Sequence, residues 1–157
     1  MERGFKTELR RLNRTMSRVR NIQTGRLDKV PTPTFIDLLL KHGRFYSPQP
    51  LLRGLRRGAP KNCFYNAWRI AQRECRFSYA EGYVVSADLH ILIHHGFLVD
   101  ETGAFECTLK KPANVYFGME FNTTALITTE GCQAIGDETE WLCRHRAALQ
   151  RWEQARI

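Results

Sequence analysis

The sequence lacks any long uninterrupted hydrophobic run. Its longest strongly apolar stretch, residues 89–99, contains His90, His94 and His95, whereas a bilayer span needs about 20 consecutive apolar residues. The opening residues, MERGFKTELRR, contain no apolar segment of the kind that a secretory signal requires. These absences exclude a membrane-spanning protein, and we expect a protein that folds in the cytoplasm.

Cysteine is sparse, and its arrangement argues against two common uses. The five cysteines are widely spaced and form no Cys-x-x-Cys pair: Cys63, Cys75, Cys107, Cys132 and Cys143. An odd number with this spacing argues against a disulfide framework and does not match the common structural zinc sites. We therefore expect reduced thiols, mostly buried as small hydrophobic groups, of which at most one is reactive.

Acidic residues are scarce in the first half of the chain. Residues 1–75 hold 17 Lys and Arg against 5 Asp and Glu, whereas residues 76–157 hold 7 against 11. The formal net charge of +8 is therefore concentrated in the first half. Such a basic segment binds a polyanion such as nucleic acid or another anionic surface. Alternatively, it docks on the acidic half, on a partner protein or within a larger assembly.

The remaining composition is that of an ordinary globular domain. The chain has 157 residues, of which 43% are hydrophobic and 25% charged, enough to bury one sizeable core. Periodicity and turn residues predict an α+β fold, in which N-terminal helices pack on a small antiparallel sheet and a C-terminal helix follows. The predicted helices are 1–20, 35–42, 63–75, 122–130 and 137–155, the predicted strands are 77–86, 89–99, 104–109 and 115–121, and 44–62 is a basic loop. We expect two parts, a basic helical arm with its linker over 1–58 and an α+β core over 59–157.

The first predicted helix is amphipathic. Its apolar residues step by three and four positions and lie along one stripe, which consists of Phe5, Leu9, Leu12, Met16 and Val19. Basic residues cover the remaining surface. The pattern fits a helix docked through its stripe with the basic face in solvent. It also fits nucleic-acid contact by the basic face, or binding to a membrane surface or a partner helix.

Cys63 stands at the predicted start of a helix, directly after a loop that contains glycine and proline. The partial positive charge of a helix N-terminus favours a thiolate over a thiol, and Lys61 adds to this effect. Because a thiolate is the nucleophile of a cysteine hydrolase, Cys63 is a candidate nucleophile. A structural role for a cysteine at a helix start is the alternative.

His95 and Glu106 are the candidate base and its orienting acid. One pairing of the predicted hairpin places Val99 opposite Ala104. In that register His95 lies opposite Thr108, and Glu106 is its diagonal neighbour on the same face. A carboxylate there holds the imidazole in one tautomer. A slip of one residue in the strand register would move Glu106 to the other face of the sheet. As an alternative to catalysis, a lone histidine in a strand also fits a role in the core.

Five short motifs follow one another in a recognisable order: NCFYNA at 62–67, YAEGY at 79–83, HGFLVD at 95–100, GAFECTL at 103–109 and YFGMEF at 116–121. A nucleophile on a helix, then a histidine on a strand, then an acid on the next strand resembles papain-like cysteine hydrolases. That group includes peptidases, transglutaminase-like enzymes and NlpC/P60 amidases. More narrowly, the motifs are similar to those of a set of uncharacterised bacterial and phage proteins of papain-like type.

The resemblance implies a papain-like core with Cys63 as nucleophile, His95 as general base and Glu106 as orienting acid. Phe97 and Glu106 stand where the pattern has Trp and Asp. Gly96 beside His95 leaves room for an acyl group. The resemblance implies no metal and no organic cofactor.

Further site residues are expected around the nucleophile. The backbone N–H of Cys63 would be one oxyanion donor, and Asn62 and Tyr83 are candidates for the second. Gly82 either lines the cleft or permits close strand packing, and Asn66 ties the helix to the hairpin.

These residues predict a cysteine-dependent hydrolase or acyl transferase whose substrate is a peptide, a protein or another amide. The alternative is a non-catalytic papain-like module whose basic residues 1–58 contact nucleic acid or an acidic partner. A structural or assembly protein is the third hypothesis.

Overall fold

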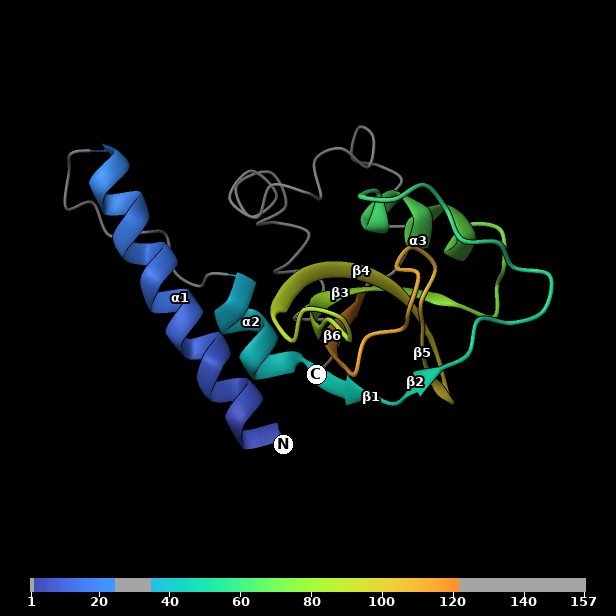
Figure 1. Ribbon diagram of the computed structural model, residues 1–157, viewed down its shortest axis with the longest axis horizontal. Coiled ribbons are helices and arrows are strands. Elements are labelled where there is room, and N and C mark those ends of the chain that lie inside the picture. Colours follow the sequence, from blue (N-terminus) through green and yellow to red (C-terminus); the bar gives the residue numbers. More distant parts are fainter. Residues whose placement is uncertain (1, 25–34, 122–157) are drawn as a thin grey trace. The chain divides into compact units, whose positions relative to one another are not determined.

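The computed structural model describes the backbone of residues 2–24 and 35–121 and the side chains of residues 2–15 and 35–121 (Figure 1). The chain divides into two units, residues 1–42 and 43–157. The predicted helices over 122–130 and 137–155 lie outside the described residues. None of the described helices combines the length and the apolarity that a membrane span requires.

The first unit consists of two helices that pack against each other. They are α1 (Glu2–Thr24) and α2 (Phe35–His42). Phe5 and Leu9, one helical turn apart on the predicted stripe, are both buried. The Asn13 side-chain amide donates a hydrogen bond to Asp37 of α2 at 2.9 Å. The amphipathic pattern therefore identified the buried side of α1 correctly, while the helix extends four residues beyond the predicted end at residue 20.

The second unit is built on one six-stranded sheet with strand order β1-β6-β3-β4-β5-β2. Neighbouring strands are antiparallel, except for β2 and β5, which are parallel. The sheet is therefore mixed, in contrast to the antiparallel sheet that the hairpins predicted. Its strands are β1 (Arg44–Tyr46), β2 (Pro48–Gln49), β3 (Ser78–Val85), β4 (Leu92–Asp100), β5 (Gly103–Phe105) and β6 (Val115–Phe121).

The sheet is curled so that its two edges approach each other. β1 and β2 lie at opposite edges, yet only Ser47 separates them along the chain. The Ala104 N–H donates a hydrogen bond to the Ser47 carbonyl at 2.9 Å. Gly103 has φ +148°, and a Cβ there would lie 2.1 Å from the same carbonyl oxygen, so only glycine fits this junction.

Residues 43–58 belong to the sheet unit and not to the helical arm in which the sequence analysis placed them. Their strands β1 and β2 pair with β6 and β5. The stretch was predicted as loop because strands of three and two residues are too short to show alternation, and Pro48 and Pro50 are typical of loops.

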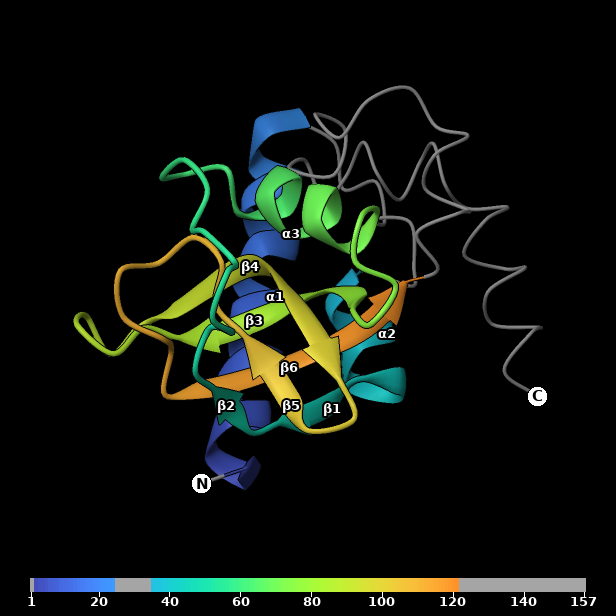
Figure 2. The same ribbon diagram turned by 90° about the vertical axis from the view of Figure 1, so that its right-hand side faces the viewer.

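Helix α3 (Cys63–Ala71) lies against β4 and β3 (Figure 2). Gly96 of β4 permits this contact, because a Cβ there would lie 2.8 Å from the Cα of Phe64. Ala67 and Ala71, two small residues on one side of the helix, are buried. Residues without bulky side chains therefore bring the first turn of α3 directly onto the strand that carries His95.

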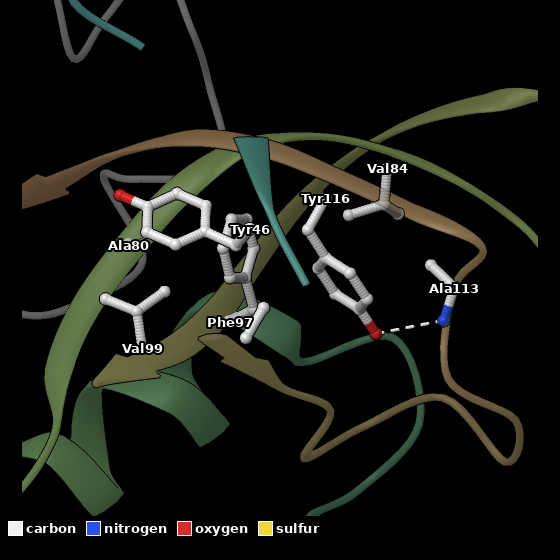
Figure 3. Close-up of a cluster of buried hydrophobic side chains, with 8 residues drawn as sticks. Tyr46, Ala80, Val84, Phe97, Val99, Ala113 and Tyr116 are labelled. Carbon is white, nitrogen blue, oxygen red and sulfur yellow. Dashed lines mark hydrogen bonds between the residues drawn. The ribbon is translucent and has the colours of Figure 1, made fainter. Parts of the chain in front are cut away.

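A hydrophobic cluster fills the opposite side of the sheet (Figure 3). Phe97 lies at its centre, with ring centroids 5.1 Å from Tyr116 and 5.8 Å from Tyr46. The other buried members are Ala80, Val84, Val99, Ala104 and Ala113. By strand alternation His95 points to the same side as Phe97 and Val99, so the imidazole borders the core.

Candidate active site

The ladder between β4 and β5 ends just before the site. The last pair joins Leu98 of β4 to Phe105 of β5. After Phe105 the chain no longer pairs with β4. The predicted pairing of Val99 with Ala104 is confirmed. The predicted strand over 104–109 is too long, however, and His95 and Thr108 form no ladder pair. Cys63 and Glu106 contact His95 along the part of β4 that is not paired with β5.

Cys63 is the first residue of α3. Asn62 precedes it as the N-cap residue without a side-chain capping bond, and Lys61 has φ +66°. A non-glycine residue in this left-handed region is uncommon and typical of constrained sites. The tight turn places the sulfur at the helix N-terminus, where the partial positive charge favours a thiolate. Cys63 is 9% exposed.

The pKa of the Cys63 thiol is lowered. Burial raises this pKa, but the hydrogen bond and charge of His95 and the backbone hydrogen bonds from Gly96 and Phe64 outweigh burial. Gly96 lies on the part of β4 that has lost its β5 neighbour, so its backbone is available to the sulfur. The backbone of β4 beyond the end of the β5 ladder therefore stabilises the thiolate directly.

His95 lies between the sulfur and a carboxylate. Its Nε2 is 3.0 Å from Oε2 and 3.2 Å from Oε1 of Glu106, which leaves Nδ1 for the hydrogen bond with Cys63. Burial lowers the pKa of His95, but its hydrogen bonds and the charges of Cys63 and Glu106 raise it to about 9. The geometry therefore favours a thiolate–imidazolium pair at neutral pH.

Glu106 is fully buried but well supplied with hydrogen-bond donors. Its Oε1 accepts the backbone N–H groups of Thr108 at 2.7 Å and Leu109 at 2.8 Å. Its Oε2 accepts the hydroxyl of Tyr116 at 2.9 Å and faces His95. Burial raises the pKa of Glu106, but His95 and the backbone N–H groups of Leu109 and Thr108 lower it, with His95 foremost. The carboxylate is held charged and in one orientation.

Tyr116 is a site residue that the sequence analysis missed. Its hydroxyl donates to Glu106 and accepts the Ala113 N–H at 2.9 Å (Figure 3). Burial and the charge of Glu106 raise the Tyr116 pKa, so the phenol stays protonated and remains a donor. The stretch 116–121 was noted only as a motif, because a tyrosine in a strand is more simply interpreted as a packing residue.

Asn66 ties the first turn of α3 to the segment after β5, as predicted. Its amide nitrogen donates to Thr108 Oγ1 at 2.9 Å and to the Ala59 carbonyl at 2.8 Å. Gly58 makes room for this amide, since a Cβ there would lie 2.0 Å from Asn66 Oδ1. The contact fixes the element that carries Cys63 relative to the segment that carries Glu106.

The three other predicted site residues lie in different surroundings. Asn62 is exposed directly beside Cys63. Gly82 pairs with His95, and a Cβ there would lie 2.0 Å from the Phe117 carbonyl oxygen, so this position serves close strand packing. Tyr83 is 4% exposed, and its ring stacks on His94 at 5.2 Å between centroids.

Comparison of the chain with protein-family models, with curated protein sequences and with solved structures finds no match. The function of the protein is therefore inferred from the chemistry of the residues at the site.

We expect Tyr116→Phe to destabilise the protein by about 1–3 kcal/mol, because it removes a hydrogen bond to a buried charged group and leaves the Ala113 N–H without its acceptor. The substitution should also shift the pH dependence of Cys63 alkylation, since Glu106 loses one of its donors. Urea unfolding and alkylation rates across pH measure the two effects.

Tyr79→Phe is the matched control for this substitution. Tyr79 is also fully buried, and its hydroxyl donates to Glu81 at 2.6 Å. This variant should lose stability but keep the wild-type pH profile of Cys63. Equal profile shifts in both variants would show that Tyr116 has no particular connection with the site.

Proposed function

We propose that the protein is a cysteine-dependent hydrolase or acyl transferase with a papain-like core, acting on an amide or peptide-type bond. One observation carries the proposal. Cys63, at the start of a helix, hydrogen-bonds His95, whose other ring nitrogen meets the buried carboxylate of Glu106 at 3.0 Å. Nucleophile, base and orienting acid in this order are the parts that covalent acyl transfer requires.

Acylation begins with the thiolate–imidazolium pair. The Cys63 sulfur attacks the carbonyl carbon of the amide, a C–S bond forms, and the carbonyl π electrons move onto the oxygen. The oxyanion then re-forms the carbonyl, the C–N bond breaks, and His95 transfers its proton to the departing nitrogen. The amine leaves, and a thioester on Cys63 remains with a neutral imidazole.

Deacylation reverses the proton transfer. His95 removes a proton from water, the resulting hydroxide attacks the thioester carbonyl, and the C–S bond breaks to give a carboxylic acid and the Cys63 thiolate. An amine in place of water gives acyl transfer. Glu106 stabilises the imidazolium in both steps and keeps Nε2 protonated, so Nδ1 is the nitrogen that exchanges the proton.

The oxyanion needs donors beside the sulfur. The backbone N–H of Cys63 lies at the first position of α3, where helix N–H groups have no acceptor within the helix. The exposed side chain of Asn62, the adjacent residue, is the proposed second donor. Together they would stabilise the negative charge that develops during the attack.

Selective alkylation tests the proposal. At about pH 6, iodoacetamide should modify Cys63 roughly tenfold faster than Cys75 or more, because the lowered pKa leaves a larger fraction of Cys63 as thiolate, the reactive form. Cys75 is a suitable internal reference because it is a free and exposed thiol, so that slow labelling there cannot be due to burial, whereas Cys107 is 0% exposed. Peptide mapping by mass spectrometry after timed quenching measures each rate.

Cys63→Ser is the control for this labelling, because it should abolish the fast event and leave the slow ones unchanged. Equal and slow labelling of Cys63 and Cys75 in the wild-type protein would contradict the proposal.

The alternative function, a non-catalytic module that binds a polyanion, has one observation in its favour. Arg3, Arg10, Arg11 and Arg14 of α1 are all exposed. In that case a labelled DNA duplex should bind the full chain with an affinity that falls steeply with salt, and Cys63→Ser should bind equally well.

A further inference from the structure

A basic segment leads directly into the nucleophile. Residues 51–61, here called the basic segment, carry four exposed basic side chains: Arg53, Arg56, Arg57 and Lys61. Within the described part of the chain, none of these four side chains forms an ion pair. No Asp or Glu occurs between Asp37 and Glu74, so local sequence supplies no neutralising charge.

The basic segment has a defined backbone. Leu52 and Leu55 close a turn through a backbone hydrogen bond of 3.1 Å, and Gly54 supplies the left-handed residue of that turn with φ +97°. Leu51, Leu52 and Leu55 are partly buried while the neighbouring arginines face solvent. The leucines therefore hold the backbone, and the cationic groups remain available to a ligand.

Two hydrogen bonds fasten the same stretch of chain to residues close in sequence to Glu106 and Cys63. The Gly58 N–H donates to the carbonyl of Cys107, the residue after Glu106, at 2.8 Å. The Ala59 carbonyl accepts the amide of Asn66 at 2.8 Å. Lys61, in its constrained left-handed conformation, is only two residues from Cys63. The segment that leads into the nucleophile therefore carries four cations that have no ion pair among the described residues.

We propose that these cations select substrates with a negative charge beside the scissile amide, that is, acidic peptides. This inference rests on the proposed function, because it assigns the substrate class of the same site. Carboxylate side chains are the negative charges that a peptide carries close to its amide bonds. Lys61, Arg57 and Arg56 attract such a group to the nucleophile, and the attraction acts on substrate capture.

Two alkylating reagents of nearly the same size test the proposal. Iodoacetate carries a negative charge and iodoacetamide is neutral, and both react with the same thiolate. The ratio of their rates at Cys63 cancels any change in the thiolate fraction. In the triple variant Arg56→Gln, Arg57→Gln, Lys61→Gln, we expect this ratio to fall roughly fourfold at low ionic strength and to change little at about 1 M salt.

Arg73→Gln is the matched control. It removes one positive charge, as Lys61→Gln alone does, but from an exposed position just beyond the other end of α3. At the same low ionic strength Arg73→Gln should lower the rate ratio at Cys63 less than Lys61→Gln does, because the charge it removes lies farther from the sulfur. Equal ratios in wild type and triple variant would overturn the proposal.

Two further outcomes separate the hypotheses. If iodoacetamide itself labels Cys63 slowly, the proposed function fails, whatever the rate ratio. If the ratio is unchanged but a labelled DNA duplex binds the wild type and not the triple variant, the basic segment serves nucleic acid, and the assignment to acidic peptides is wrong.

Discussion

His95→Ala will reduce the alkylation rate of Cys63 at about pH 6 by 100-fold or more. The substitution removes the hydrogen bond and the positive charge that lower the Cys63 pKa, while burial, which raises it, remains. The Cys63 pKa will then rise, although the backbone hydrogen bonds from Gly96 and Phe64, which lower it, remain. Any amide hydrolysis should fall by about 10²–10⁴, the usual contribution of a general acid–base group.

The pH profile of the wild-type protein follows from the same pair. The active form needs a thiolate on Cys63 and a proton on His95. The rate of amide hydrolysis should rise with pH while Cys63 loses its proton. This rise should occur below the ordinary thiol range, because the Cys63 pKa is lowered. The rate should fall again near pH 9, where His95 loses its proton. A profile that only begins to rise near about pH 8.5 would contradict this account.

His94→Gln is the control for His95→Ala. His94 is the adjacent residue of β4, but burial and the charge of His95 lower its pKa to about 4, so it is neutral at pH 6 and adds no charge to the thiolate. Its ring packs against Phe64 and Tyr83. The variant should lose some stability but keep fast Cys63 labelling in the folded protein.

Glu106→Ala should destabilise the protein by about 3–5 kcal/mol, the usual cost of breaking a buried ion pair. The substitution leaves His95, Tyr116 and two backbone N–H groups without the acceptor they share. Glu106→Gln keeps one acceptor oxygen and should cost less, but it should still lower the His95 pKa. Chemical unfolding measured across pH checks these values.

The pKa shifts of Glu106 and His95 determine how the stability of the protein depends on pH. Glu106 has a lowered folded-state pKa, so its stabilisation is present above the unfolded value of about 4.3 and is lost as pH falls. His95 has a raised folded-state pKa, so its stabilisation is present below about 6.5 and is lost as pH rises through about 9. The cost of Glu106→Ala should therefore be largest in the range where both groups are charged.

Glu120→Gln provides the comparison for Glu106. Glu120 pairs with Arg44 and Tyr46 on β1, and its side chain is 29% exposed. Surface pairs of this kind contribute about 0–1 kcal/mol. A loss as large as that of Glu106→Ala would contradict the special role assigned to the buried carboxylate.

Elements with strong local signals were predicted well from the sequence. The bounds of α2 (Phe35–His42) and β6 (Val115–Phe121) agree with prediction, and β3 lies within the predicted 77–86. The start of α3 at Cys63 was also predicted. In each case apolar spacing, a terminating glycine or a run of aromatic and β-branched residues acts within a few positions.

The parts that depend on contacts distant in sequence could not be predicted. The closure of the sheet by β1 and β2 requires pairing with residues more than fifty positions away. The partnership of Tyr116 with Glu106 depends on β5 leaving the ladder after Phe105. Local propensity carries no information on either event, because both are set by the curl of the whole sheet.

The thiolate content of the protein distinguishes a Cys63–His95 ion pair from an ordinary buried thiol. Ultraviolet absorbance of thiolate, recorded for wild type and for Cys63→Ser across pH, isolates the titration of one sulfur. Because His95 lowers the Cys63 pKa, the extra thiolate of wild type should appear at a lower pH than that of an ordinary thiol, whose pKa is about 8.5. A difference that appears only near or above about pH 8.5 would show that Cys63 and His95 form no ion pair at neutral pH.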